Sequence, residues 1–215
     1  MSPEYESLVN SLIKDGYLKT PEIIETFKAI DRINFVPEEY KSDAYVNAPL
    51  PIGLGQTISQ PLTVAFMLEL LEPKVCEKIL DIGAGSGWQT AILAYIVSHN
   101  CKRETGRVFG IERLSELREF AEKNVAKYNF IEKGIEKIIC ADGSNGYKDE
   151  APYDKIIAAA ASEGSVPESW RKQLKIGGRL VAPVDHSVIV IDKIGKNKYS
   201  QKEYYGFSFV PLIKD

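Results

Sequence analysis

Cysteine and histidine are scarce in this chain of 215 residues, which contains three cysteines and two histidines. Cys76, Cys101 and Cys140 show neither a Cys-x-x-Cys spacing nor a nearby group of histidines, so the sequence gives no sign of a zinc site. We expect three reduced thiols that pack as small hydrophobic side chains, rather than a disulfide. We also expect no bound metal.

The sequence also lacks a long hydrophobic run and an excess of basic residues. Its longest apolar stretches, such as residues 91–97, are too short to cross a bilayer, and its N-terminus is acidic where a secretory signal would be basic. A formal net charge of -3 argues against the basic face of a dedicated nucleic-acid binder. We therefore expect a cytoplasmic protein, monomeric, with no membrane or nucleic-acid partner.

Short apolar runs alternate with longer amphipathic ones from residue 78 onward, which is typical of a parallel sheet with helices on both faces. We expect strands at Lys78–Ile82, Arg107–Ile111, Lys137–Ala141, Tyr153–Ala158, Arg179–Val184, Val188–Lys193 and Glu203–Val210, the last of them antiparallel. Helices are expected at Gln89–Ser98, Leu114–Tyr128 and Pro167–Leu174. This pattern predicts an α/β, Rossmann-like, doubly wound fold.

The part before residue 76 has a different pattern. A helix is expected to begin after Thr20, with Pro21 in its first turn, whereas proline and glycine make residues 37–55 irregular. We expect one domain over 1–215. It would consist of a helical extension and active-site flap (1–75), a cofactor-binding core (76–184) and C-terminal antiparallel strands (185–215).

A glycine loop follows the first expected strand of the core, at Asp81-Ile82-Gly83-Ala84-Gly85-Ser86-Gly87. Such a loop lets the backbone approach a ligand and direct N–H groups at an anion. A dinucleotide-binding loop would have a third glycine where Trp88 stands. The spacing resembles the loop of class I S-adenosylmethionine methyltransferases, although a simple strand-to-helix turn remains an alternative.

Acidic residues follow the next two strands. Glu112 comes after one strand, where a carboxylate can accept hydrogen bonds from both ribose hydroxyls, and Asp142-Gly143 comes after the other, where it can meet an adenine ring. Cofactor contacts are therefore expected from Asp81, Gly83, Ala84, Gly85, Gly87, Glu112, Asp142 and Gly143.

Several segments resemble protein-L-isoaspartate O-methyltransferases, particularly the bacterial branch. They run in the family's order and include Phe35-Val36-Pro37, residues 44–53, residues 55–61 with Thr57-Ile58-Ser59, residues 141–143, residues 151–154, residues 173–184 and Phe209-Val210-Pro211-Leu212. The resemblance implies that Ser59 is the catalytic residue and that Gln56, Thr57, Ile58 and Ser59 cover the bound S-adenosylmethionine. It also implies that the substrate is a damaged protein with an L-isoaspartyl residue.

A role for Ser59 can also be stated from chemistry. The acceptor carboxylate, with an unperturbed pKa of ~4, is ionised near neutral pH and needs no base. The hydroxyl can therefore act by orienting this carboxylate rather than as a nucleophile. A structural alternative is that Ser59 caps the helix expected after Gln60-Pro61.

The chain departs from the family at three places. Leu62 and Val64 stand where the animal branch has histidines, the lip Ser162-Glu163-Gly164-Ser165 lengthens a turn, and Asp185 stands where relatives generally have glycine. The changed lip makes the acceptor less certain than the cofactor. An RNA-base or small-molecule methyltransferase, or a module that only binds the cofactor, therefore remains an alternative.

Overall fold

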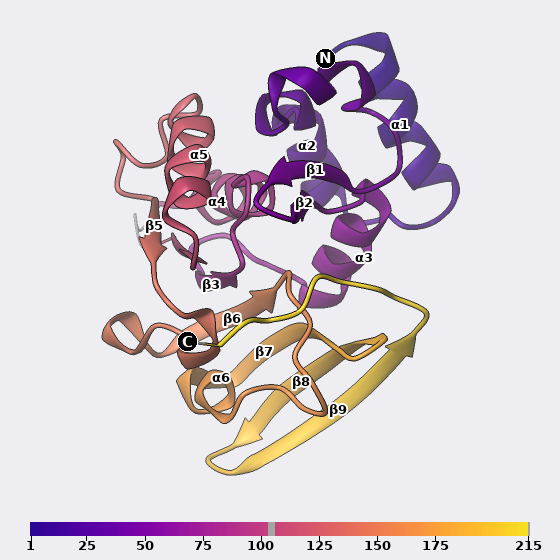
Figure 1. Ribbon diagram of the computed structural model, residues 1–215. Helices are drawn as coiled ribbons and strands as arrows, with labels where there is room; N and C mark the ends of the chain where they lie inside the picture. The colour runs from indigo at the N-terminus through magenta and orange to yellow at the C-terminus, as the bar shows by residue number, and fades with distance from the viewer. Residues whose placement is uncertain (103–105, 215) are drawn as a thin grey trace.

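A seven-stranded sheet forms the centre of the computed structural model, which describes residues 1–102 and 106–214 (Figure 1). Its strands are β3 (Lys78–Ile82), β4 (Arg107–Glu112), β5 (Glu136–Cys140), β6 (Tyr153–Ala158), β7 (Leu174–Val184), β8 (Ser187–Gly195) and β9 (Lys198–Tyr205). Their order in the sheet is β5-β4-β3-β6-β7-β8-β9. Strands β3 to β7 pair in parallel, and the β7-β8-β9 end is antiparallel. The predicted fold class is confirmed.

Helices cover both faces of this sheet, unequally. The helices are α1 (Pro3–Lys14), α2 (Pro21–Ala29), α3 (Pro61–Leu71), α4 (Trp88–Ser98), α5 (Ser115–Ala126) and α6 (Glu168–Gln173), with short 3-10 turns η1 (Arg32–Phe35), η2 (Glu38–Asp43), η3 (Gly143–Asn145) and η4 (Lys148–Glu150). Buried residues of α1 to α5 pack with Ile79, Val108 and Ile157 of the sheet. Trp170 of α6 packs on the opposite face. The side-chain alternation of parallel strands therefore builds two cores.

The N-terminal helices begin where the sequence places their caps. Ser2 accepts a hydrogen bond from Tyr5 N at the start of α1. Thr20 is the N-cap residue of α2, as predicted, but its hydroxyl donates to Glu69 on α3. Glu69 also accepts from the backbone N–H groups of Lys19 and Thr20. One carboxylate thus caps α2 and fastens it to α3.

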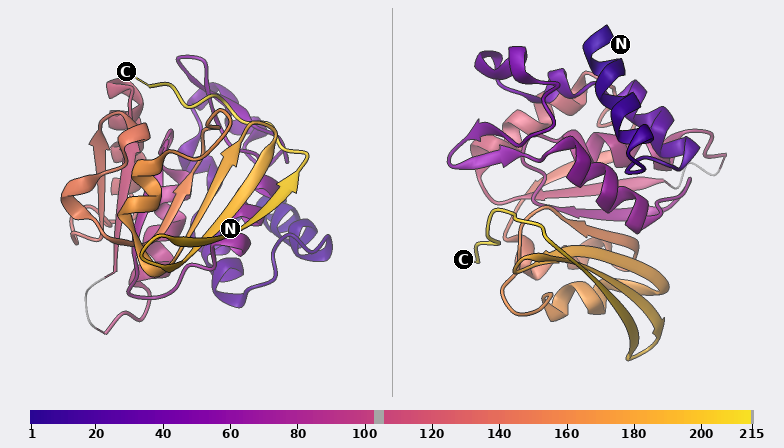
Figure 2. Two further views of the ribbon diagram at one scale, coloured as in Figure 1. Left: turned by 90° about the horizontal axis from the view of Figure 1, so that it is seen from below. Right: turned by 90° about the vertical axis from the view of Figure 1, so that its right-hand side faces the viewer.

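Several elements differ from the predicted ones; β7, for example, begins at Leu174 rather than at Arg179, and β9 begins at Lys198 rather than at Glu203. The end of the irregular stretch forms a hairpin, β1 (Leu50–Gly53) paired antiparallel with β2 (Gln56–Ile58). The last strand ends at Tyr205, so the expected strand Glu203–Val210 is wrong beyond that residue. From residue 206 the chain instead crosses toward the carboxyl ends of the parallel strands, where hairpin and C-terminal tail face each other (Figure 2).

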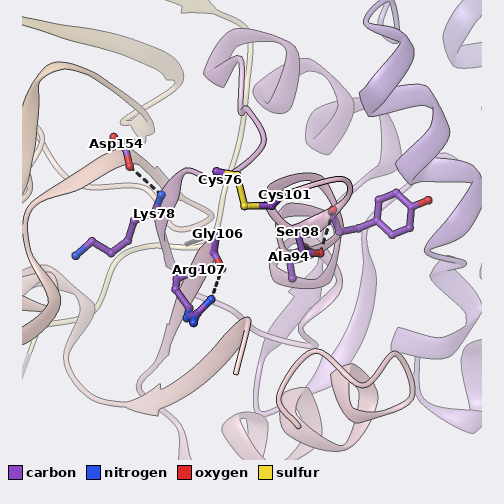
Figure 3. Close-up of a disulfide and its surroundings, with 9 residues drawn as sticks. Cys76, Lys78, Ala94, Ser98, Cys101, Gly106, Arg107 and Asp154 are labelled. Atoms are coloured by element: carbon purple, nitrogen blue, oxygen red, sulfur yellow. Dashed lines mark hydrogen bonds between the residues drawn. A yellow bond between two sulfur atoms is a disulfide. The ribbon is translucent and has the colours of Figure 1, made fainter. Parts of the chain in front are cut away.

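The expectation of three reduced thiols is wrong. Cys76 and Cys101 form a disulfide with Cα atoms 5.3 Å apart, within the usual range (Figure 3). Sequence spacing could not show this, because helix α4 returns the chain to the start of β3, where Cys76 N donates to Val97 O. Cys140 has a free thiol and is exposed.

Reduction of this disulfide should destabilise the protein. The bond closes a loop over a sequence separation of 25 that contains the glycine loop and α4. Loop-closure entropy predicts a loss of about 3 kcal/mol, or about 10 °C in Tm, for the double variant Cys76→Ser, Cys101→Ser. Thermal unfolding followed by circular dichroism would measure it, with Cys140→Ser as the matched control. An unchanged Tm in the double variant would contradict the prediction.

Candidate active site

A cleft of about 390 Å³ opens at the carboxyl ends of the parallel strands. It lies where the sheet order reverses, with β3 leading outward to β4 on one side and to β6 on the other. Nine of the predicted site residues line it: Gln56, Thr57, Ile58, Ser59, Gly83, Ala84, Gly85, Glu112 and Gly143. The structure therefore brings the flap, the glycine loop and the ends of two further strands into one cavity.

The glycine loop forms the floor of this cleft through backbone bonds to the neighbouring strand. Gly83 N and Ala84 N donate to Ile111 O at 2.8 and 2.9 Å. Gly85, with a φ of 54°, donates its N–H to the Glu112 carboxylate at 2.9 Å. All three amides therefore bond the end of β4, which fixes the conformation of the loop.

Glu112 is the central acidic group of the cleft. Its side chain is buried, and its two oxygens accept from Gly85 N and Leu114 N at 2.9 and 3.0 Å. Each carboxylate oxygen has a second lone pair, so both can still accept from a diol. The position predicted for a ribose-binding carboxylate is thus both fixed in place and able to bind.

Three predicted cofactor residues do not line the cleft. Asp81 is fully buried and accepts from Gln89 Nε2 and Thr90 Oγ1, both at 2.7 Å, so it faces α4. Gly87 is where α4 and α5 meet, because a Cβ there would lie 2.9 Å from Val125. Asp81 and Gly87 therefore fix the conformation of the glycine loop through contacts with α4 and α5.

Asp142 also lies outside the cleft and shapes the turn after β5. It is the N-cap of η3 and accepts from Ser144 N and Ser144 Oγ at 2.8 Å. This turn presents Gly143 to the cleft, where a Cβ would come within 2.6 Å of Ile82. Glycine is therefore the residue that the close approach of η3 to β3 permits.

Ser59 lies between hairpin strand β2 and helix α3. The N-cap residue of α3 is Gln60, so the alternative that Ser59 caps this helix is wrong. The α3 N-terminus is instead bound by Asn47, whose Oδ1 accepts from Leu62 N at 3.0 Å. Ser59 lines the cleft, and within residues 1–102 and 106–214 its hydroxyl makes no hydrogen bond. It is free to bind a ligand there.

The C-terminal tail forms a wall that was not predicted as part of the site. Residues 208–213 line the cleft. Ala161 holds the tail by accepting from Leu212 N at 2.7 Å and donating its own N–H to Val210 O at 2.8 Å. The ring of Phe207 stacks on Phe66 of α3, with ring centroids 4.9 Å apart. The match of residues 209–212 to the family was the signal that could have identified this wall.

Two of the sequence departures lie against each other. Asp185 Oδ1 accepts from Gly164 N at 3.1 Å, and Ser162 pairs with Pro183 and Asp185 through its backbone. The lip at residues 162–165 is therefore fastened to the end of β7 by Asp185 and by the backbone of Ser162.

Trp88, which directly follows the glycine loop, both packs the N-terminal helices and lines the cleft. It is buried against Phe27 and donates its indole N–H to Ile30 O, and it also lines the cleft. The aromatic ring thus connects the N-terminal helices to the site.

The parallel sheet with its reversal at β3, the glycine loop and the acidic residue after β4 define a class I S-adenosylmethionine-dependent methyltransferase. The family model of the protein-L-isoaspartate(D-aspartate) O-methyltransferases matches residues 3–215. The chain belongs to this family. The match confirms the resemblance, the enzyme class and the cofactor predicted from the sequence.

Named relatives agree over nearly the whole chain. The protein-L-isoaspartate O-methyltransferase of Thermococcus sibiricus is 42% identical over 214 residues, covering 96% of this chain and 91% of the relative. That of Staphylothermus marinus is 39% identical over 214 residues, with 98% and 94% covered. A crystal structure from Plasmodium falciparum, described as a complex with S-adenosyl-L-homocysteine, superposes with a TM-score of 0.87 at 24% identity, covering 98% of this chain and 99% of that one.

Glu112 should control cofactor affinity. Glutamine in its place would aim one amide N–H₂ at a backbone N–H donor, whichever way the amide is turned. A charge-assisted hydrogen bond contributes about 1.5–3 kcal/mol, so we expect Glu112→Gln to weaken S-adenosylhomocysteine binding at least about tenfold. Titration calorimetry measures this, and Glu116→Gln on exposed α5 is the control. Unchanged affinity in Glu112→Gln would rule out the contact.

A second buried carboxylate lies behind the site. Glu136 on β5 shares a sheet face with Asp81, and neither of its oxygens has a hydrogen-bond partner in the described ranges. Burial, with a smaller contribution from Asp81, raises the pKa of Glu136 well above its usual range. Burial also raises the pKa of Asp81 to about 6, against the two hydrogen bonds that lower it.

Glu136 should make stability depend on pH. A carboxyl whose folded pKa is raised contributes stability below its unfolded pKa of ~4.3, and this contribution is lost as pH rises through the folded value. Glu136→Gln removes the titrating group and with it this loss of stability at high pH. We therefore expect the variant to be more stable than the wild type by about 1 kcal/mol or more at pH 8 and equally stable at pH 4. Urea unfolding at both pH values, with exposed Glu39→Gln as control, measures the difference. An equal gain at both pH values would show another cause.

Proposed function

We propose that the chain transfers the methyl group of S-adenosylmethionine to the free carboxylate of L-isoaspartyl residues in damaged proteins, with Ser59 orienting that carboxylate. The observation that carries the proposal is that Ser59 lines the same cleft as the glycine loop and Glu112, while its hydroxyl has no hydrogen-bond partner in the described ranges.

The donor set fits S-adenosylmethionine, which when bound supplies a methyl group on a positively charged sulfur. Glu112 keeps lone pairs for the ribose hydroxyls, and Gly143 offers a close backbone approach for the adenine. Gly83, Ala84 and Gly85 form the floor, and Gln56, Thr57 and Ile58 the cover. Asp81, Gly87 and Asp142 support this site by fixing the loops.

Ser59 acts by positioning. The acceptor carboxylate is ionised near neutral pH, so no residue needs to remove a proton before transfer. A hydroxyl donor can hold one carboxylate oxygen and leave the other directed at the methyl group. Holding two reactants in this way can supply roughly 7–11 kcal/mol of a bimolecular barrier. This also accounts for Leu62 and Val64, where the animal branch has histidines.

Exclusion of water is the second contribution of the protein. The acceptor and the donor carry opposite charges that transfer removes, and fixed protein dipoles can replace their hydration. The hairpin β1–β2 and the C-terminal tail border the cleft from two sides. The methyl ester that forms carries a better leaving group than the free carboxylate does. The nitrogen of the neighbouring backbone amide can attack the ester carbonyl and expel methanol, which takes up the amide proton, and the ring that closes is a succinimide.

The remaining expectations are part of the same proposal. The protein would work as a monomer in the cytoplasm, as one domain over 1–215, without a nucleic-acid partner. No helix within residues 1–102 and 106–214 is long and apolar enough to span a membrane.

A matched peptide pair tests the proposal. Two peptides that differ only in L-isoaspartate against L-aspartate would be incubated with the protein and methyl-labelled cofactor. We expect base-labile label in the isoaspartyl peptide alone. Ser59→Ala should lower kcat about 100-fold and leave S-adenosylhomocysteine binding unchanged, because only the acceptor is misplaced. Ser200→Ala on the exposed strand β9, away from the cleft, is the control.

The two parts of the proposal can fail separately. Equal labelling of both peptides, or of neither, would exclude the isoaspartyl activity. Selective labelling with a full kcat in Ser59→Ala would keep the activity and exclude the role of Ser59.

A further inference from the structure

Arg32 is a buried cation with an unusual set of partners. It is fully buried in η1, and its guanidinium donates to four backbone carbonyls. Nη1 bonds the carbonyls of Ala44 at 2.7 Å and Val46 at 3.2 Å. Nη2 bonds those of Ala48 at 2.9 Å and Ser59 at 3.1 Å. All four acceptors lie within residues 44–59, the segment that contains the β1–β2 hairpin.

The charge of Arg32 is balanced without an ion pair in the described ranges. Four carbonyl dipoles surround it, and its guanidinium carbon lies 5.5 Å from the centre of the Trp88 ring, which adds a cation–π attraction. Burial lowers the pKa of Arg32 to about 10, which leaves it charged near neutral pH. Since an unpaired buried charge is costly, the guanidinium requires these carbonyls where they are.

The positions of the acceptors in the chain show what the guanidinium holds together. Ala48 lies just before hairpin strand β1, and Ser59 lies just after β2. One nitrogen, Nη2, bonds both carbonyls and so closes the base of the hairpin. Trp88, under the guanidinium, lines the cleft directly after the glycine loop. Arg32 therefore connects the base of the hairpin to the residue that follows the glycine loop.

We propose that Arg32 is a positioning residue for the acceptor site: by holding the Ser59 carbonyl and the base of the hairpin, it sets where the Ser59 hydroxyl stands over the cleft. This inference rests on the role proposed above for Ser59. Arg32 itself does not line the cleft. It acts through the backbone on either side of the hairpin.

The geometry requires arginine rather than any cation. A planar guanidinium places its donors in a fixed fork, whereas the lysine ammonium is a point charge with three donors. Arg32→Lys keeps the charge but cannot bind both ends of the hairpin base and the carbonyls of Ala44 and Val46 together. We therefore expect a graded series, with lysine between arginine and methionine.

The test compares Arg32→Lys and Arg32→Met with Tyr5→Phe, a matched control. The Tyr5 hydroxyl also donates to two buried carbonyls of the N-terminal part, those of Phe27 and Ile30, at 2.7 and 3.0 Å, and none of its bonds reaches Ser59. Steady-state kinetics with the isoaspartyl peptide would be measured below each variant's unfolding temperature. Amide hydrogen exchange over residues 44–62 would be followed with S-adenosylhomocysteine bound.

We expect Arg32→Met to lower kcat about 100-fold, as for a displacement of about 1 Å, and to lose less than about tenfold in S-adenosylhomocysteine affinity. Arg32→Lys should lie between Arg32→Met and the wild type, with faster exchange in residues 44–62. Tyr5→Phe should lower Tm and keep the wild-type kcat.

Three outcomes would overturn the inference. The first is a wild-type kcat in folded Arg32→Met. The second, which applies if the methionine variant does not fold, is a wild-type kcat in Arg32→Lys. The third is a loss of kcat in Tyr5→Phe as large as the loss in the Arg32 variants. If the wild type labels no isoaspartyl peptide, the proposed function fails; unchanged exchange in residues 44–62 of the Arg32 variants would then separately refute the anchoring of the hairpin.

Discussion

The hydrogen bond from Gly85 N to the Glu112 carboxylate joins the ends of two neighbouring parallel strands, and the cleft depends on it. Gly83 and Ala84 add two backbone bonds to Ile111 at the same place. The loop after β3 is therefore fixed to β4 by the protein's own groups, with its glycines at positive φ. A cofactor meets a floor whose shape and acidic acceptor are already in place, which lowers the ordering cost of binding.

The sheet could be predicted from the sequence because its signals are local. Lys78–Ile82 and Tyr153–Ala158 have the predicted bounds, since each is a short apolar run that ends in a glycine- or alanine-rich turn. Glu112 and Gly143 reach the cleft for the same reason: a residue that follows a parallel strand must lie at the carboxyl edge of the sheet. Ser59 needed the family resemblance, because its own neighbourhood equally favoured a helix cap.

Features that depend on distant pairings were missed. Cys76 meets Cys101 only because α4 reverses the chain, and the tail after Tyr205 leaves the sheet for Ala161. Asp81 was predicted as a ligand contact because it begins the motif, yet strand alternation turns its side chain toward α4. Motif spacing specified which residues gather near the cofactor but not which side of the strand each one faces.

The floor of the cleft belongs to the buried sheet and to α4, whereas the cover combines apolar packing with polar anchors, and the reaction explains why. Leu50, Ile52 and Ile58 of the hairpin are buried in the main core. Polar anchors fix the cover at its ends: Arg32 binds carbonyls around the hairpin base, Asn47 binds the start of α3, and Ala161 binds the tail. Leu54 at the hairpin tip and Val46 beside its base are exposed and add little packing. A protein substrate must enter beside the cofactor, and water must then be kept out. Anchors at the base with an unpacked tip let the cover yield at its edge while the backbone around Ser59 stays fixed.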